Sequence, residues 1–320
     1  MSFAATPAGA PRRPSPRTLA VTVAVVAWLV AGAFGLSRYI ANYQRYRGFP
    51  PPAHAAGIPA GRLVTARIRS TALGRTADYV IYEPPGYAAA ARGGRRFPVL
   101  YLLHAPPGSP TGFLTIGALG VRMDDAIAAH RIRPFLVVIP DGHTSRFGND
   151  TEWANAAAGP YESFVLDIVR SVDTRYATLP TRGERAVAGL SEGGYGAANV
   201  ALHQLATFGT FESWSGYFTQ TPTQSFTGAS AASLRANSPR AYVPALARQL
   251  RREPTWAFLY RGAHDRLTSR ADTQAFAARF AAAGGHVTTA EYAGSHNWWL
   301  WRAHLPAMLR FASEHFRRSG

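Results

Sequence analysis

A serine in a glycine-rich turn is the clearest indication of chemistry in this chain. Residues 189–193 read Gly-Leu-Ser-Glu-Gly, a G-x-S-x-G pattern with Ser191 at its centre. The pattern follows the apolar run 186–190 and leads into the small-residue stretch 193–198. A strand that turns sharply into a helix exposes a serine hydroxyl at the edge of a sheet. We therefore expect Ser191 to act as a nucleophile.

A serine hydroxyl becomes a good nucleophile only when a base accepts its proton and a carboxylate orients that base. Around a turn of this kind the partners follow in the order serine, acid, histidine. Asp265 lies just past the apolar run 256–260 and is the expected acid. His296 lies between the last strand and the last helix of the pattern and is the expected base. The alternatives suit structural positions better: Asp272, Glu291 and His304.

The oxyanion that forms when a carbonyl is attacked needs N–H donors, each contributing about 3–4 kcal/mol. One donor is expected from the backbone of Glu192, directly after the serine. The second is expected from the loop 104–109, in which Pro106 and Pro107 follow Ala105. Proline has no N–H. Ala105 is therefore the expected second donor, with Gly108 or a side chain as the alternative.

Polar and aromatic side chains near other strand ends are expected to line the substrate cleft. They are His104, Asp141, His143, Arg146 and Trp153. A metal cluster among the histidines and acids at these strand ends is conceivable. However, His104, His143 and His264 show no recognisable ligand spacing, and the serine mechanism accounts for more residues. We therefore expect neither a metal nor another cofactor.

Strands and helices that could position these residues alternate along the chain from residue 63. The expected strands are 63–69, 79–83, 99–104, 135–140, 186–190, 256–260 and 287–292. The expected helices are 121–130, 161–176, 193–205, 269–283 and 300–316. This alternation predicts an α/β fold with a mostly parallel sheet covered by helices on both faces. Residues 218–245 break the pattern and are expected to form a loop or small lid over the site, or a solvated surface loop.

The N-terminal region predicts a membrane segment. Residues 1–18 are expected to be disordered and basic, 19–40 to be a transmembrane anchor or signal segment, and 41–62 a linker. Leu19 to Leu36 is free of charge, and a bilayer core requires roughly 20 apolar residues as helix. Ala31-Gly32-Ala33 offers a cleavage site for the alternative, a signal peptide. Either alternative would put the catalytic domain, residues 63–318, outside the cytoplasmic membrane.

Composition excludes several classes of function. The chain has 320 residues and no cysteine, so disulfides and thiolate chemistry are excluded. Its net charge is +16, carried by arginines that are scattered rather than clustered. With no recognisable nucleic-acid-binding motif, we expect no nucleic-acid partner. A basic surface also suits anionic lipids or envelope polymers.

Four stretches resemble the esterase D group of the α/β-hydrolase superfamily. This group includes feruloyl esterases, S-formylglutathione hydrolases and secreted mycolyltransferases. The stretches are VLYLLHAPPGS, AGLSEGGYGA, GAHD and GSHNWWLWRAHLPAML, and residues 151–176 are similar to the group's tryptophan-containing loop and following helix. The resemblance covers about residues 63–316.

The resemblance implies an α/β-hydrolase fold and a role for four positions. It implies Ser191 as nucleophile, Asp265 as acid, His296 as base and the Glu192 N–H as oxyanion donor. Relatives usually carry glycine where this chain has Ala105, followed by a residue that has an N–H. Position 106 is a proline here, so a family donor at that position is lost.

Three functions are open at this point. The first is hydrolysis of a small-molecule, lipid or carbohydrate ester through an acyl-enzyme. The second is transfer of the acyl group to a sugar or lipid hydroxyl. The third is a non-catalytic envelope-binding protein, suggested by Pro106-Pro107 and by Trp298, Trp299 and Trp301, although packing of the last helix explains these tryptophans better.

Overall fold

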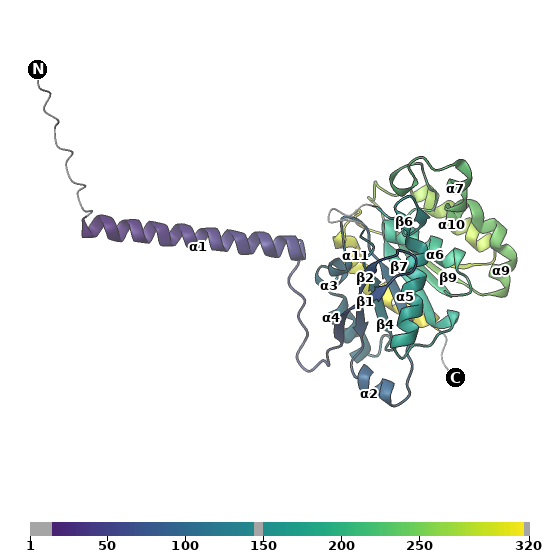
Figure 1. The fold of residues 1–320 in the computed structure, drawn as a ribbon, viewed down its shortest axis with the longest axis horizontal. Helices are drawn as coiled ribbons and strands as arrows, with labels where there is room; N and C mark the ends of the chain where they lie inside the picture. Colours follow the sequence, from purple (N-terminus) through teal and green to yellow (C-terminus); the bar gives the residue numbers. More distant parts are fainter. Residues whose placement is uncertain (1–14, 144–149, 317–320) are drawn as a thin grey trace, which may run out of the picture. The chain divides into compact units, whose positions relative to one another are not determined.

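The computed structural model describes residues 15–143 and 150–316, and the chain divides into two units at Pro50. The first unit holds one long helix, α1 (Pro16–Tyr46), drawn in purple in Figure 1. Within it, Leu19–Tyr46 contains an 18-residue window whose mean hydropathy is 2.3, and none of this window is buried. By length and composition this helix is able to cross a membrane.

Helix α1 is longer than the segment 19–40 expected from the sequence. It begins within the region expected to be disordered and continues to Tyr46, six residues into the expected linker. The reason is that residues 41–46 contain neither glycine nor proline. The helix ends where Arg47 and Gly48 adopt φ values of 52° and 84°, just before Pro50. A linker after the helix would thus begin no earlier than residue 47.

The second unit is built on an eight-stranded sheet with the order β1-β2-β4-β3-β7-β8-β9-β10. The strands β1 and β2 pair antiparallel with each other, and β2 pairs antiparallel with β4. All other pairs in this sheet are parallel. The strands are β1 (Arg62–Arg69), β2 (Thr76–Glu83), β3 (Val99–Leu103), β4 (Leu136–Pro140), β7 (Arg185–Leu190), β8 (Thr210–Trp214), β9 (Trp256–Gly262) and β10 (His286–Tyr292).

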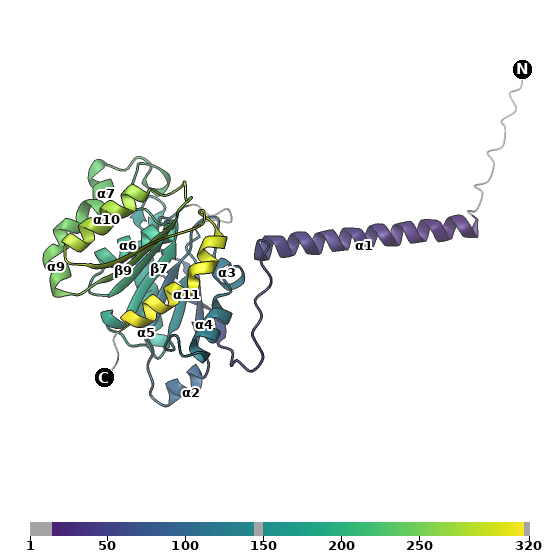
Figure 2. The same cartoon turned by 180° about the vertical axis from the view of Figure 1, so that it is seen from behind.

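Helices pack on both faces of the sheet, as Figures 1 and 2 show. Alternate side chains of β3 enter two different cores: Val99, Tyr101 and Leu103 face one, and Leu100 and Leu102 face the other. This period of two is what a strand buried on both faces requires. The first core contains side chains of α5 (Tyr161–Arg175), α6 (Glu192–His203) and α10 (Arg270–Ala282). The second contains side chains of α3 (Pro110–Thr115), α4 (Leu119–Ala128) and α11 (Trp298–His315).

The strands that the sequence predicts are all present, and the structure adds β8. This strand reads Thr-Phe-Glu-Ser-Trp, and its central Glu212 is fully buried. Burial raises the pKa of Glu212 well above its usual range, and the carboxyl accepts a hydrogen bond from Trp214 Nε1 at 3.1 Å. Because a glutamate stands in the middle of this strand, residues 210–214 do not form an apolar run, and the sequence does not predict β8.

Smaller elements complete the fold. The segment 218–245 contains short helices in addition to loop. These elements are α7 (Ala231–Ala236), α8 (Pro239–Tyr242) and the 3-10 turns Gln224–Phe226 and Val243–Leu246. Elsewhere lie α2 (Tyr87–Arg92), α9 (Ala247–Arg252), the 3-10 turn Arg182–Glu184 and the small hairpin of β5 (Asn155–Ala156) and β6 (Gly159–Pro160).

Candidate active site

Ser191 occupies the sharp turn between β7 and α6. Its φ and ψ are 54° and −120°, a conformation that costs an L-residue about 1–3 kcal/mol. The flanking glycines make the turn possible. A Cβ on Gly189 would lie 2.2 Å from the Gly193 carbonyl oxygen, and a Cβ on Gly193 would lie 2.1 Å from the Leu103 carbonyl oxygen. The G-x-S-x-G pattern is therefore required by the close approach of α6 to β3 and β7.

Three strand ends bring together a hydroxyl, an imidazole and a carboxylate. Ser191 follows β7, Asp265 follows β9, and His296 follows β10. Ser191 Oγ lies 2.8 Å from His296 Nε2, and His296 Nδ1 lies 2.9 Å from Asp265 Oδ2. The three side chains that the sequence singled out thus form one continuous hydrogen-bonded chain.

Asp265 is held as an anion behind the imidazole. Its side chain is fully buried, and Oδ1 accepts hydrogen bonds from the N–H groups of Leu267 and Thr268 at 2.9 Å and 3.1 Å. Burial alone would raise the pKa of Asp265, but His296 and these hydrogen bonds lower it well below the usual range. The alternative acids lie elsewhere: Asp272 is on α10, where it binds Phe218 and Thr219, and Glu291 is on β10.

Two backbone positions flank the serine hydroxyl. Glu192 is the first residue of α6, and Ala105 follows β3 by two residues. Both line the cavity at Ser191. The Pro106–Pro107 peptide bond is cis, and Gly108 N–H donates to the Ala105 carbonyl at 2.7 Å. Gly108 thus uses its N–H within the loop, which leaves the amides of Glu192 and Ala105 as the candidate oxyanion donors.

A cavity of about 400 Å³ opens beside Ser191. Its walls are mostly polar and come from loops distant in sequence. They are Ala105, Pro106, Asp150, Glu152, Ser191, Glu192, Tyr217, Thr219, Gln220, Thr221, Gln224, Leu267, Thr268 and His296. Four of these residues lie between 219 and 224, so the segment that breaks the α/β alternation does contribute to the cavity wall.

Four of the five substrate-lining residues expected from the sequence are not among the described residues of this wall: His104, Asp141, His143 and Trp153. Trp153 is only 1% exposed, because its ring packs against Gly142 and Gly196 and its Nε1 donates to the His104 carbonyl at 2.8 Å. His104 is buried as well, and Asp141 and His143 lie outside the cavity lining. Arg146 lies outside the described residues. The acids Asp150 and Glu152 line the cavity instead, and the sequence carried no periodic signal for them.

Buried acids form one side of the cavity. The carboxyl of Glu192 accepts hydrogen bonds from the N–H groups of Thr151 and Glu152 at 3.2 Å and 2.7 Å. Burial, and then the charge of Glu152, raise the pKa of Glu192 well above its usual range. Burial also raises the pKa of Glu152 to about 7, against the opposing hydrogen bonds from Tyr217 and Gln220. Near neutral pH this wall therefore carries less negative charge than its residue types suggest.

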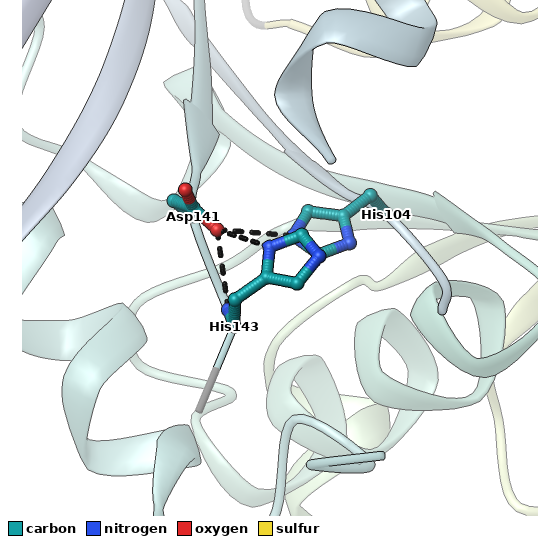
Figure 3. A group of neighbouring side chains, drawn as sticks. All are labelled: His104, Asp141 and His143. Atoms are coloured by element: carbon teal, nitrogen blue, oxygen red, sulfur yellow. Dashed lines mark hydrogen bonds and ion pairs between the residues drawn. The ribbon is translucent and has the colours of Figure 1, made fainter. Parts of the chain in front are cut away.

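Figure 3 shows a second group of polar side chains, His104, Asp141 and His143. His143 Nδ1 lies 2.5 Å from Asp141 Oδ1, and His104 Nε2 lies 3.8 Å from the same oxygen. Burial lowers the pKa of His104 to about 4, whereas the hydrogen bond to Asp141 raises the pKa of His143.

The tryptophans of the last helix differ in exposure. Trp301 is buried, and its Nε1 donates to Ser215 Oγ at 3.3 Å. Trp298 packs edge-on against Phe113, with ring centroids 5.6 Å apart. Trp299 is 65% exposed. Packing of α11 therefore accounts for two of the three rings.

Comparison with known proteins places the second unit in a family. A sequence model described as "Putative esterase" matches residues 70–312. An endo-1,4-beta-xylanase/feruloyl esterase of Xylanibacter ruminicola is 30% identical over 161 residues, which are 49% of this chain and 22% of that protein. An esterase of Mycobacterium tuberculosis is 31% identical over 159 residues, 48% of this chain and 32% of that protein. The chain thus matches a third or less of the length of these relatives.

Solved structures share the fold. A ferulic acid esterase superimposes with a TM-score of 0.70 at 23% identity, covering 80% of this chain and 99% of that one. An S-formylglutathione hydrolase from Agrobacterium tumefaciens superimposes with a TM-score of 0.66 at 13% identity, covering 84% and 100%. The solved structures show that the second unit has an α/β-hydrolase-type fold. The family match over residues 70–312 shows that the chain belongs to the Esterase family.

Proposed function

We propose that this chain is a serine-dependent carboxylic-ester hydrolase. The observation that carries the proposal is the hydrogen bond of 2.8 Å between Ser191 Oγ and His296 Nε2, with Asp265 behind the ring. The names of the relatives, an esterase and a feruloyl esterase, support the same class of reaction.

The proposed reaction has two halves. His296 Nε2 takes the proton of Ser191 Oγ as this oxygen bonds to the ester carbonyl carbon, and Asp265 stabilises the imidazolium. The bond to the alcohol oxygen then breaks, and His296 gives its proton to the departing alcohol. Water attacks the acyl-enzyme, His296 accepts its proton, and the acid leaves as Ser191 Oγ is protonated again. The N–H groups of Glu192 and Ala105 would bind the carbonyl oxygen in both halves.

A fluorophosphonate probe tests this proposal, because it phosphonylates an activated serine. We expect the wild-type chain to be labelled and Ser191→Ala to be unlabelled and inactive on p-nitrophenyl acetate. Ser163→Ala is a matched control, since Ser163 lies on α5 outside the cavity wall. Labelling that persists in Ser191→Ala would refute the assignment.

Acyl transfer to a hydroxyl is a second candidate. It is favoured by the polar wall, in which Thr219, Gln220 and Thr221 can hydrogen-bond a sugar or glycerol acceptor. Incubation with p-nitrophenyl ester and glycerol or trehalose separates the two reactions. Acylated polyol supports transfer, and free acid as the single product restricts the chain to hydrolysis.

We also propose that α1 anchors the chain, with the second unit on the extracytoplasmic side. The support is the unburied apolar stretch Leu19–Tyr46. Protease treatment of intact cells should remove the second unit and leave the anchor in the membrane. A mature chain that starts after Ala33 would instead identify a cleaved signal peptide, and a protease-resistant second unit would reverse the orientation.

A further inference from the structure

His104, Asp141 and His143 meet at one edge of the sheet for a reason given by the topology. The strands β3 and β4 are parallel neighbours, and their carboxyl ends therefore lie side by side. His104 directly follows β3, Asp141 directly follows β4, and His143 comes two residues later. In Figure 3 the carboxylate of Asp141 points at both imidazole rings.

The donor atoms of these residues converge on a small volume. One carboxylate oxygen and two imidazole nitrogens all lie within 4.8 Å of one another. Two imidazoles and one carboxylate are a ligand set that suits divalent transition metals, and three protein ligands with a water complete a four-coordinate zinc site.

Hydrogen bonding identifies which imidazole nitrogen has a lone pair. The N–H of Gly142 donates to His104 Nε2 at 3.1 Å, so this nitrogen is an acceptor and is not protonated. It faces Asp141 Oδ1 at 3.8 Å, beyond hydrogen-bond distance. Two electron-rich atoms thus face each other, and a cation between them would interact favourably with both.

The cluster is rigid on one side and accessible on the other. The His104 ring lies against the His143 ring, with centroids 4.9 Å apart, and edge-on to Trp153, with centroids 5.2 Å apart. The side chains of Asp141 and His143 are 39% and 25% exposed. An ion can therefore approach from solvent, and small rotations of these two side chains would close the ligand set.

We propose that His104, Asp141 and His143 form a binding site for one divalent transition-metal ion. Zn²⁺ is the ion used to test it. Binding would displace the proton shared by His143 and Asp141 to solvent and would replace the hydrogen bond from Gly142 to His104. The ion would link the ends of β3 and β4 beside the loop that contains Ala105. This proposal is independent of the proposed ester hydrolysis.

Metal content of the full chain tests the site. Protein in detergent is incubated with Zn²⁺, desalted and measured by mass spectrometry, and the dissociation constant is measured by competition with a chelating dye. We expect one zinc per chain, with a dissociation constant below about 10 µM. The variants His143→Ala and Asp141→Asn should each weaken binding at least tenfold. Two variants serve as matched controls and should retain it: His264→Ala and His296→Ala.

Two further measurements make the result decisive. Co²⁺ in the same protein should give visible absorption bands of a histidine-ligated ion, which disappear in His143→Ala. Excess Zn²⁺ should raise the Tm of the wild-type second unit by about 3–8 °C and leave that of folded His143→Asn unchanged. Wild-type protein that retains no zinc after desalting, or undiminished affinity in either ligand variant, would overturn the site. Neither readout depends on esterase activity, so failure here is distinguishable from failure of the proposed function.

Discussion

At the scale of single residues, the proposed binding of the oxyanion can be tested at the backbone N–H of Ala105. Pro106 and Pro107 lack N–H groups, and Gly108 donates within the loop. Ala105→Pro would remove the candidate donor with little change in side-chain size. We expect kcat on p-nitrophenyl acetate to fall by about 10²–10³-fold. Ala105→Gly keeps the N–H and should retain most activity, and an equal loss in both variants would contradict the role.

Glu152 makes stability depend on pH. Burial raises its pKa from about 4.5 to about 7. Between these values the folded chain holds a proton that the unfolded chain has lost, so the free energy of unfolding falls as pH rises through this window. Glu152→Gln imitates the neutral carboxyl and should reduce the fall between pH 4.5 and pH 7 by roughly 1–3 kcal/mol.

Denaturant titrations at pH 4.5 and pH 8 measure this effect. Glu314→Gln is the matched control, because Glu314 is exposed on α11 and should leave the pH dependence as it is in the wild type. An unchanged pH dependence in Glu152→Gln would show that Glu152 is ionised throughout this range.

At the scale of elements, the turn between β7 and α6 depends on missing side chains. A Cβ on Gly193 would lie 2.1 Å from the carbonyl oxygen of Leu103. Neither atom can move away by rotation of a side chain, because the backbone fixes the position of both. We expect Gly193→Ala to lower the free energy of unfolding by about 3–5 kcal/mol, or to prevent folding. In Gly120→Ala, on α4, the nearest atom is Leu63 Cδ1 at 3.8 Å, and the change should stay within about 1 kcal/mol. Equal stability of the two variants, measured by urea titration, would contradict this account.

The elements also show which parts of the molecule the sequence reveals. Strands buried on both faces, such as β3 and β7, appear as apolar runs, and residues 191 and 265 follow two such strands, β7 and β9. His296 follows the edge strand β10, which contains both polar and apolar residues. The strand β8 is not predicted because the sequence does not distinguish a buried glutamate, such as Glu212, from an exposed one. Trp153 is expected at the cleft from the sequence but is buried, because an aromatic residue near a site can be part of its support. The cavity-wall acids Asp150 and Glu152 lie in a loop, where no periodicity identifies them.

At the scale of the whole molecule, the apolar helix and the sheet unit occupy separate parts of the sequence, so that the chain can be cut between them. Residues 1–50 contain six of the arginines and all of Leu19–Tyr46. We expect a chain that begins at Pro51 to remain in the supernatant after cell lysis and high-speed centrifugation, whereas the full chain sediments with membranes. Its activity on p-nitrophenyl acetate should stay within about twofold of the full chain, because the proposed catalytic residues all lie beyond residue 100. Sedimentation of both chains would show that the sheet unit itself binds membranes.

The cavity of about 400 Å³ beside Ser191 is near the lower end of the range for small-ligand pockets. A compact acyl group, such as an acetyl or a single aromatic ring, fits within such a space. The tail of a long fatty acid would extend past the rim into solvent, where it gains no burial to offset the loss of water from the polar wall. Discrimination among esters by tail length would then arise at the mouth of the cavity rather than at the reacting carbonyl.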